Sequence, residues 1–132
     1  HIFLGQKTTR KLALYAIGGG GKSSTTATLG ASTTAYTTTG EVANSGSYTA
    51  GGGALTNVNP STSGTTGFTD FADISFTTAT ITARGALIYN DTASGDPAVV
   101  VLDFGSNKSS SAGDFAVVMP TFNSSSALIR IA

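Results

Sequence analysis

Hydrophobic and polar residues alternate along much of the chain with the period of two that is typical of β-strands. The clearest case is RKLALYAIG, residues 10–18, in which Leu12 and Leu14 would lie on one face of a strand and Ala13 and Tyr15 on the other. Since both faces are apolar, we predict that this strand is buried on both sides.

The second half of the chain repeats this pattern in short segments that are separated by polar turns, such as NDTASGDP at residues 90–97. Residues 18–53 contain mainly Gly, Ser and Thr with isolated large side chains, which predicts long loops or edge strands. No segment shows a convincing helical periodicity. The further strands that we predict are 53–60, 66–78, 79–90, 98–105, 113–120 and 125–132.

These features predict an all-β protein, folded as an antiparallel β-sandwich or as a small barrel of the jelly-roll type. Residues 1–132 would form one β domain with long loops rich in Gly, Ser and Thr, and residues 1–9 are a candidate N-terminal arm. The composition agrees, because 22 Thr, 16 Ser and 17 Gly occur among 132 residues. Thr favours pleated, half-buried surfaces and Gly marks turns.

The chain is electrically neutral, with seven Lys and Arg against seven Asp and Glu, and it has no basic cluster. Binding of nucleic acid or of an anionic membrane surface normally needs such a cluster, so we expect neither partner. The apolar runs are too short to span a bilayer. The absence of cysteine excludes disulfides and thiol chemistry.

One segment, AIGGGGKSS at residues 16–24, fits a relaxed phosphate-loop pattern, and AVVVLDF at 98–104 ends near Asp103 like a magnesium-binding strand. A phosphate loop needs a helix directly after its lysine, because the helix amides complete the anion site. The residues after Lys22, SSTTATLGASTTAYTTTG, are rich in β-branched Thr and show no helical stripe. We therefore interpret the segment as a glycine tract after a strand, and Asp103 as an acid that faces solvent or caps a turn.

Other catalytic arrangements are also weakly supported. His1 is the only histidine and lies at the terminus, so neither a Ser-His-Asp set nor a histidine metal site is expected. The aspartates lie mostly beside turn residues, which favours solvated turns over a catalytic carboxylate pair. These aspartates are Asp70, Asp73, Asp91, Asp96, Asp103 and Asp114. We predict a protein that is not an enzyme and that has no catalytic residues, cofactor or metal.

Two arginines lie inside otherwise apolar strand candidates, Arg84 in TITARGALIY and Arg130 in SALIRIA. A guanidinium in such a strand must reach solvent on the outer face or pair with an acid. Both outcomes stay open here: an arginine that faces outward, or an ion pair with a neighbouring subunit.

Several segments carry a resemblance to a known family: KLALY, TTTGEVANSGSYTAGG, DFAD, ARGALIY, AVVVLDFG and the C-terminal ALIRIA. In these segments the chain resembles a family of small virion structural proteins that are encoded by tailed bacteriophages. The resemblance covers nearly all of residues 11–132. The opening HIFLGQKTTR has no counterpart in it, and the glycine tract at 18–22 departs from the shorter polar turn of the pattern.

The resemblance implies a particle component on the virion. One role is a capsid decoration or cement protein that binds the outer surface of the head and bridges subunits of the major capsid protein, as a homo-oligomer with a trimer favoured. The alternative is a tail or fibre component that contacts the host surface. Large apolar or amphipathic side chains in the arm and loops would make such contacts, although the two tyrosines among them would equally serve to cover the top of the sandwich. These candidate interface residues are Ile2, Phe3, Leu4, Tyr36 and Tyr48.

Overall fold

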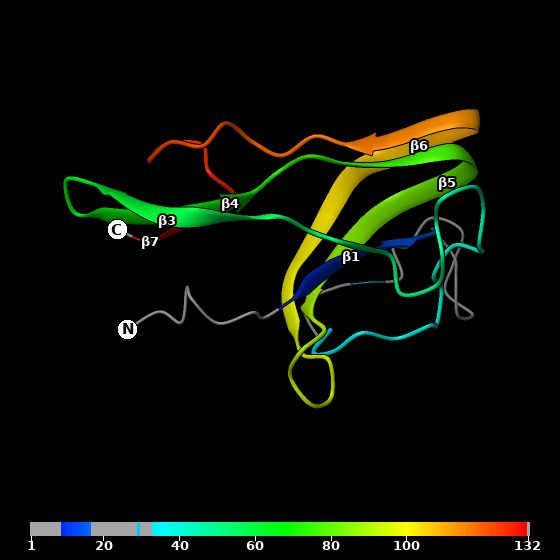
Figure 1. The fold of residues 1–132 in the computed structure, drawn as a ribbon, viewed down its shortest axis with the longest axis horizontal. Helices are drawn as coiled ribbons and strands as arrows, with labels where there is room; N and C mark the ends of the chain where they lie inside the picture. Colours follow the sequence, from blue (N-terminus) through cyan, green and yellow to red (C-terminus); the bar gives the residue numbers. More distant parts are fainter. Residues whose placement is uncertain (1–8, 17–28, 30–32, 132) are drawn as a thin grey trace.

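Seven β-strands in two antiparallel sheets form the described part of the chain, which comprises residues 9–16, 29 and 33–131 of a computed structural model (Figure 1). Those residues contain no helix, and hence none with the length and apolarity needed to cross a membrane. The strands are β1 (Arg10–Tyr15), β2 (Gly53–Ala54), β3 (Asn57–Ser63), β4 (Thr66–Phe71), β5 (Ile74–Asn90), β6 (Ala98–Val117) and β7 (Ile129–Ile131).

The larger sheet has the strand order β2-β1-β5-β6, and the smaller has the order β3-β4-β7. The prediction of an all-β, antiparallel fold is confirmed. The two sheets do not close into a barrel, so of the two predicted architectures the sandwich is the consistent one. In Figure 1 the β3–β4 hairpin extends away from the bent β5–β6 pair, and β7 lies beside it.

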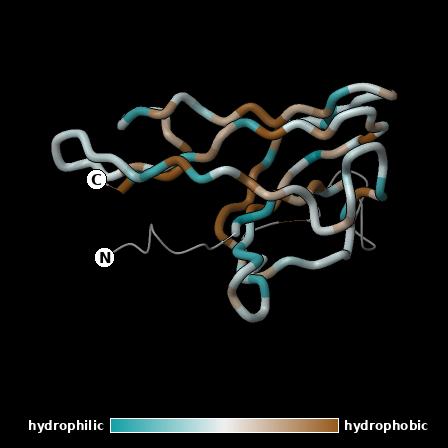
Figure 2. Tube along the Cα trace, viewed as in Figure 1, coloured by the Kyte–Doolittle hydropathy of each residue, from teal (hydrophilic) through white to brown (hydrophobic). Residues whose placement is uncertain are grey.

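Strand β1 is buried on both faces, as its sequence predicts. The exposed fractions of Leu12, Ala13 and Leu14 are 0%, and that of Tyr15 is 1%. Leu12 and Leu14 belong to the larger apolar cluster, whereas Ala13 and Tyr15 belong to a second cluster with Leu87. Full burial of a leucine contributes roughly 1.5–3 kcal/mol, which makes this strand a main source of stability. Figure 2 shows the hydrophobic positions concentrated where β1, β5 and β6 lie together.

Two predicted strands of the second half are joined into one, whereas the predicted strand 125–132 is reduced to β7. Segment 98–105 and residues 113–117 belong to one strand, β6, although SNKSSSA between them reads as a turn. The polar side chains of this stretch bond across to β5: Ser110 Oγ donates to the Ala79 carbonyl at 2.8 Å, and Thr82 Oγ1 lies 3.0 Å from Ser109 Oγ. Cross-strand hydrogen bonds of this kind let serine continue a strand that faces solvent.

Two predicted strand ends also differ from the structure. The segment 66–78 is divided at residues 72–73, where the chain passes from β4 into β5. The predicted strand 53–60 is divided at residues 55–56 into β2 and β3, and β3 continues past Pro60 to Ser63. It lies at the edge of its sheet, and its register shifts between Val58 and Ser61, so the proline needs no ladder hydrogen bond.

Gly52 offers a test of how closely the loop approaches β1. Its φ is +83°, and a Cβ there would collide with the Leu12 carbonyl oxygen. We expect Gly52→Ala to lower the free energy of unfolding by at least about 3 kcal/mol. The matched control is Gly64→Ala, at φ +59° with open space around it, which should cost only about 1–2 kcal/mol. Equal midpoints for the two variants in chemical denaturation would contradict this packing.

Candidate functional site

The chain between residues 40 and 48 covers the open edge of β1 beyond the short strand β2. The Val42 N–H donates to the Leu14 carbonyl at 3.0 Å, and the Ala16 N–H donates to the Gly40 carbonyl at 2.9 Å. The Leu14 N–H donates to the hydroxyl of Tyr48 at 2.9 Å. A side chain therefore completes an edge that would otherwise expose main-chain groups to a foreign strand.

Glu41, which is the only glutamate of the chain, lies at this edge in an isolated bridge with Tyr15. Its carboxylate accepts three hydrogen bonds. The Tyr36 hydroxyl donates to Oε1 at 2.6 Å, and the Tyr48 hydroxyl and the Gly51 N–H each donate to Oε2 at 2.7 Å. Hydrogen bonds to a charged group contribute about 1.5–3 kcal/mol each, so this carboxylate is a strong tie within the loop.

All four tyrosines of the chain lie around this carboxylate and the loop it holds. Besides Tyr36 and Tyr48, the Tyr15 hydroxyl donates to the Thr37 carbonyl and the Tyr89 hydroxyl to the Gly51 carbonyl, each at 2.6 Å. The rings of Tyr36 and Tyr89 stack with centroids 4.7 Å apart. We call this set, with Glu41, the tyrosine cluster.

The tyrosine cluster joins the two faces of the larger sheet. Tyr48 belongs to the apolar cluster of Leu12 and Leu14, whereas Tyr36 packs against the cluster on the opposite face. Oε1 of Glu41 accepts a hydrogen bond from Tyr36, and Oε2 accepts one from Tyr48. The carboxylate thus holds in place the tyrosine that packs on each face of the sheet, at the edge of β1.

The hydroxyls of the cluster are held in the neutral form. Burial raises the pKa of Tyr15 to about 12 and also raises that of Tyr89. For Tyr36 and Tyr48, burial comes first and the hydrogen bond to Glu41 raises the pKa further. Among the described residues, no buried side-chain nitrogen or oxygen lacks a partner. Each tyrosine hydroxyl of the cluster thus donates to an acceptor within the loop.

The turn at residues 45–48 fits onto an irregular part of β5. Thr78 there has a φ of +51°, which is rare for a β-branched residue. The Ser47 N–H donates to the Thr77 carbonyl at 3.0 Å, and Ser45 Oγ accepts from the Thr80 N–H at 2.8 Å. The turn supplies main-chain and hydroxyl partners at the register shift between β5 and β6, so it stabilises the bend.

The predicted interface residues lie in different places. Tyr48 is 1% exposed, so it offers no surface to a partner, and Tyr36 is half-buried in the cluster. Both pack against faces of the larger sheet, which is a covering position. Arg130 is exposed on β7. The arm residues Ile2, Phe3 and Leu4, and the phosphate-loop lysine Lys22, lie outside the described residues.

Arg84 pairs within its own chain. Its Nε donates to Asp103 Oδ1 at 3.0 Å, and the same oxygen accepts from the Gly105 N–H at 2.8 Å. The Gly105 hydrogen bond, followed by that of Arg84, lowers the pKa of the Asp103 carboxyl. Asp103 therefore caps a turn and faces solvent, as its sequence position indicates.

Two of the other aspartates act as ties for the C-terminal segment. Asp70 was expected in a solvated turn, but it is only 1% exposed, because alternation places it on the same face as Phe68. Its carboxylate accepts from the N–H groups of Phe71 at 2.8 Å and Leu128 at 3.4 Å. The carboxylate of Asp73 accepts from the Met119 N–H at 2.6 Å. The DFAD motif thus fastens both ends of residues 119–128.

Within the described ranges, no group of three or more His, Cys, Asp or Glu side chains is placed to hold a metal ion. Comparison with protein-family models, with curated proteins and with solved structures finds no match to the chain.

Sequence reasoning did not single out Glu41. One signal was available: it is the only glutamate, and it lies in a Thr- and Gly-rich segment that also contains two of the four tyrosines. A lone acid among aromatic residues that must be buried is a candidate acceptor for their hydroxyls.

Replacing Glu41 tests the contribution of its three hydrogen bonds to stability. We expect Glu41→Gln to lower the free energy of unfolding by about 2–4 kcal/mol. The glutamine amide replaces one carboxylate oxygen by an NH2 group, which would then face an O–H or N–H donor instead of accepting from it. Tyr36→Phe removes one of the three hydrogen bonds to the carboxylate and should cost about 1.5 kcal/mol, at the lower end of the range for a charged acceptor, because Tyr36 is only half-buried. Chemical denaturation measures both, and a Glu41→Gln cost no larger than that of Tyr36→Phe would contradict the three-donor geometry.

Alkaline pH gives a second test. A tyrosine whose pKa is raised on folding contributes stability that is fully present below its unfolded value of 10.0 and is lost as the pH rises through the folded value. We expect the free energy of unfolding to fall from about pH 10 upward, through the pKa of about 12 of Tyr15. Tyrosinate absorbance should appear together with unfolding. Ionisation of all four tyrosines near pH 10 in the folded protein would contradict the burial.

Proposed function

We propose that this protein is a structural component of a tailed-bacteriophage virion, and that it decorates the outer surface of the head. The sequence resemblance supports this proposal, and so does the role of the resembling segments in the fold. TTTGEVANSGSYTAGG contains Glu41, Tyr48 and Gly51 of the tyrosine cluster, and DFAD provides the two ties to the C-terminal segment. These segments hold a scaffold together, which is what a binding module requires.

The observation that carries the proposal is the exposure of large apolar side chains along the C-terminal segment. Val118 is 74% exposed, Ile131 is 73% exposed and Phe122 is 40% exposed. Phe122 packs against Phe68 of β4, with ring centroids 4.9 Å apart, so the segment lies over the smaller sheet. Large apolar side chains that stay exposed are available for contact with a protein partner.

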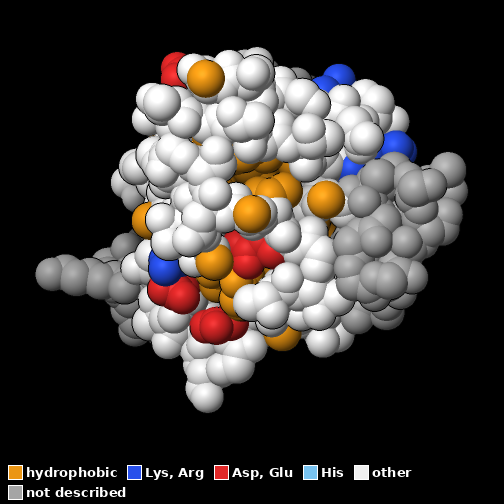
Figure 3. All heavy atoms as spheres, turned by 90° about the vertical axis from the view of Figure 1, so that its right-hand side faces the viewer, with side chains coloured by type: hydrophobic (Ala, Val, Ile, Leu, Met, Phe, Trp, Pro, Cys, Tyr) orange, Lys and Arg blue, Asp and Glu red, His pale blue; other side chains and the backbone are white. Residues whose placement is uncertain are grey.

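The neutral surface agrees with a partner that is a protein. Figure 3 shows one face on which most side chains are uncharged, with apolar and acidic ones gathered in a hollow near the centre. In this proposal the partner is the major capsid protein, and the decoration protein acts as a homo-oligomer, with a trimer favoured. Contacts of modest area suffice, because repetition over a symmetric lattice adds avidity.

Copy number in purified virions tests this function. A decoration protein should appear on a stained gel in hundreds of copies per particle and should coat the head in a low-resolution map. A few copies per particle, located on the tail, would support the alternative of a tail or fibre component. Absence of the protein from virions would overturn the proposal.

A variant can locate the contact. We expect Ile131→Asp to reduce occupancy on particles by at least about tenfold, because a buried carboxylate at an interface costs more than about 1.4 kcal/mol. Its thermal unfolding should change little, because Ile131 is already exposed. The control Ser94→Asp adds the same charge in the exposed 91–97 turn and should leave occupancy unchanged. Equal occupancy for the two variants would exclude β7 from the contact.

A further inference from the structure

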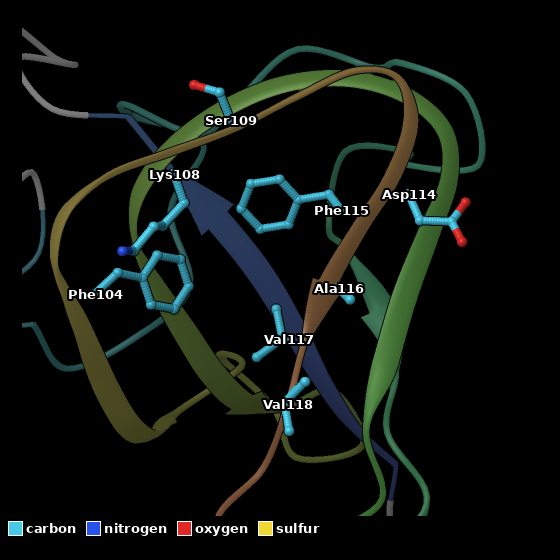
Figure 4. A pocket seen from close by; sticks show the side chains of 8 residues that line it. All are labelled: Phe104, Lys108, Ser109, Asp114, Phe115, Ala116, Val117 and Val118. Carbon is cyan, nitrogen blue, oxygen red and sulfur yellow. The ribbon is translucent and has the colours of Figure 1, made fainter.

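Strand β6 bends into an arch that encloses a groove of about 420 Å³ (Figure 4). The bend has a clear origin in the strand register. Ala83 of β5 pairs with Lys108, and Gly85 pairs with Asp103, so Arg84 alone lies opposite the four residues 104–107 of β6. The surplus on β6 forces the strand out of line with β5 and curves it.

The floor of the groove is apolar. The rings of Phe104 and Phe115 lie with centroids 6.4 Å apart, at an interplanar angle of 44°. Phe115 is 5% exposed and Val117 is 7% exposed, whereas Val118 at the end of the arch is 74% exposed. The groove can therefore take an apolar side chain onto a fixed floor, and Val118 gives it a further apolar contact.

One positive charge faces this floor. Lys108 is exposed, and Figure 4 shows its side chain beside Phe104 on the inner side of the arch. The ion pairs within the described residues are Lys11–Asp91 and Arg84–Asp103, and Lys108 takes part in neither. The carboxylate of Asp114, which also borders the groove, points away from it in Figure 4. An occupant that combines an apolar group with an anionic group would complement this surface.

The main chain beside the groove is also available. Strand β6 is the last strand of its sheet, and in the described part of the chain nothing pairs with its outer edge beyond Ala98, whose N–H donates to the Thr34 carbonyl. An open strand edge next to side-chain pockets is the arrangement by which proteins bind extended peptides.

We propose that the β6 arch binds an extended polypeptide segment that sets an apolar side chain on Phe104 and Phe115 and a carboxylate against Lys108. This inference rests on the proposed function, and the segment then belongs to the major capsid protein. A second copy of this chain and a segment without charge preference are the competing occupants, and the experiment distinguishes them.

The probe is a pair of capped synthetic hexapeptides of alternating Thr and Val, with Leu at one position and either Glu or Lys two positions later. Alternation places Leu and the charged residue on the same face of an extended chain. Binding to the full-length protein is followed by NMR shifts of the β6 amides. We expect the Glu peptide to bind about fivefold more tightly than the Lys peptide, because an exposed ion pair contributes up to about 1 kcal/mol, which is a factor of about five in affinity.

Charge reversal provides the decisive variant. Lys108→Glu should invert the preference of the two peptides, whereas Asp114→Asn should leave it unchanged, because that carboxylate points out of the groove. Thermal unfolding of both variants checks that they fold. Binding of neither peptide, equal binding of both, or a preference that Lys108→Glu does not alter would overturn the inference.

Occupancy of the protein on virions distinguishes a failure of this inference from a failure of the proposed function. If Lys108→Glu protein occupies virions as fully as the unaltered protein, the groove inference fails and the decoration role stands. If the peptides bind as expected but virions lack the protein, the decoration role fails and the groove stands as a peptide site. Concentration-dependent self-association that Lys108→Glu abolishes would assign the groove to a second copy, against the capsid segment.

Discussion

The fold depends on how the edge of one buried strand is closed. β1 is too apolar to lie at a sheet margin, yet β2 covers only two of its residues, Leu12 and Lys11. The remaining main-chain groups are satisfied by a loop that has no regular structure of its own, and that loop is held by the carboxylate of Glu41. Three hydrogen bonds to one charged group offset part of the entropy cost of ordering the glycine-rich segment around it.

The elements that follow from local pattern could be predicted from the sequence. Burial of β1 on both faces and the polar turn at 91–97 follow from the type and order of the side chains. The length of β6 could not be predicted, because serine-rich segments form turns unless a partner strand offers hydrogen bonds, and here Ala79 and Thr82 do so. Whether such a serine-rich segment continues as a strand therefore depends on the neighbouring strand as well as on its own sequence.

The carboxylates of the site also divide into those whose role follows from local sequence and those whose role depends on distant partners. Position in the sequence indicates that Asp103 caps a turn, because the groups it binds lie within two residues of it or on the adjacent strand. Besides the adjacent Phe71, Asp70 binds Leu128, which lies 58 residues away, and Asp73 binds Met119, which lies 46 residues away. The three donors to Glu41 lie within ten residues of it, and its link to β1 runs through the Tyr48 hydroxyl, which accepts from the Leu14 N–H. The long-range hydrogen bonds of Asp70 and Asp73 have no local signature in the sequence, and which apolar side chains stay exposed is also decided only by the fold.

The most direct measurement of the central claim is native-state hydrogen exchange at Gly51, whose N–H donates to Glu41. If the carboxylate holds the loop onto the sheet, this amide should exchange only through global unfolding, as slowly as that of Ile88 in the buried strand β5. The exposed Gly95 in the 91–97 turn provides the fast reference. Exchange of Gly51 at a rate close to that of Gly95 would show that the loop opens independently, and would contradict the account.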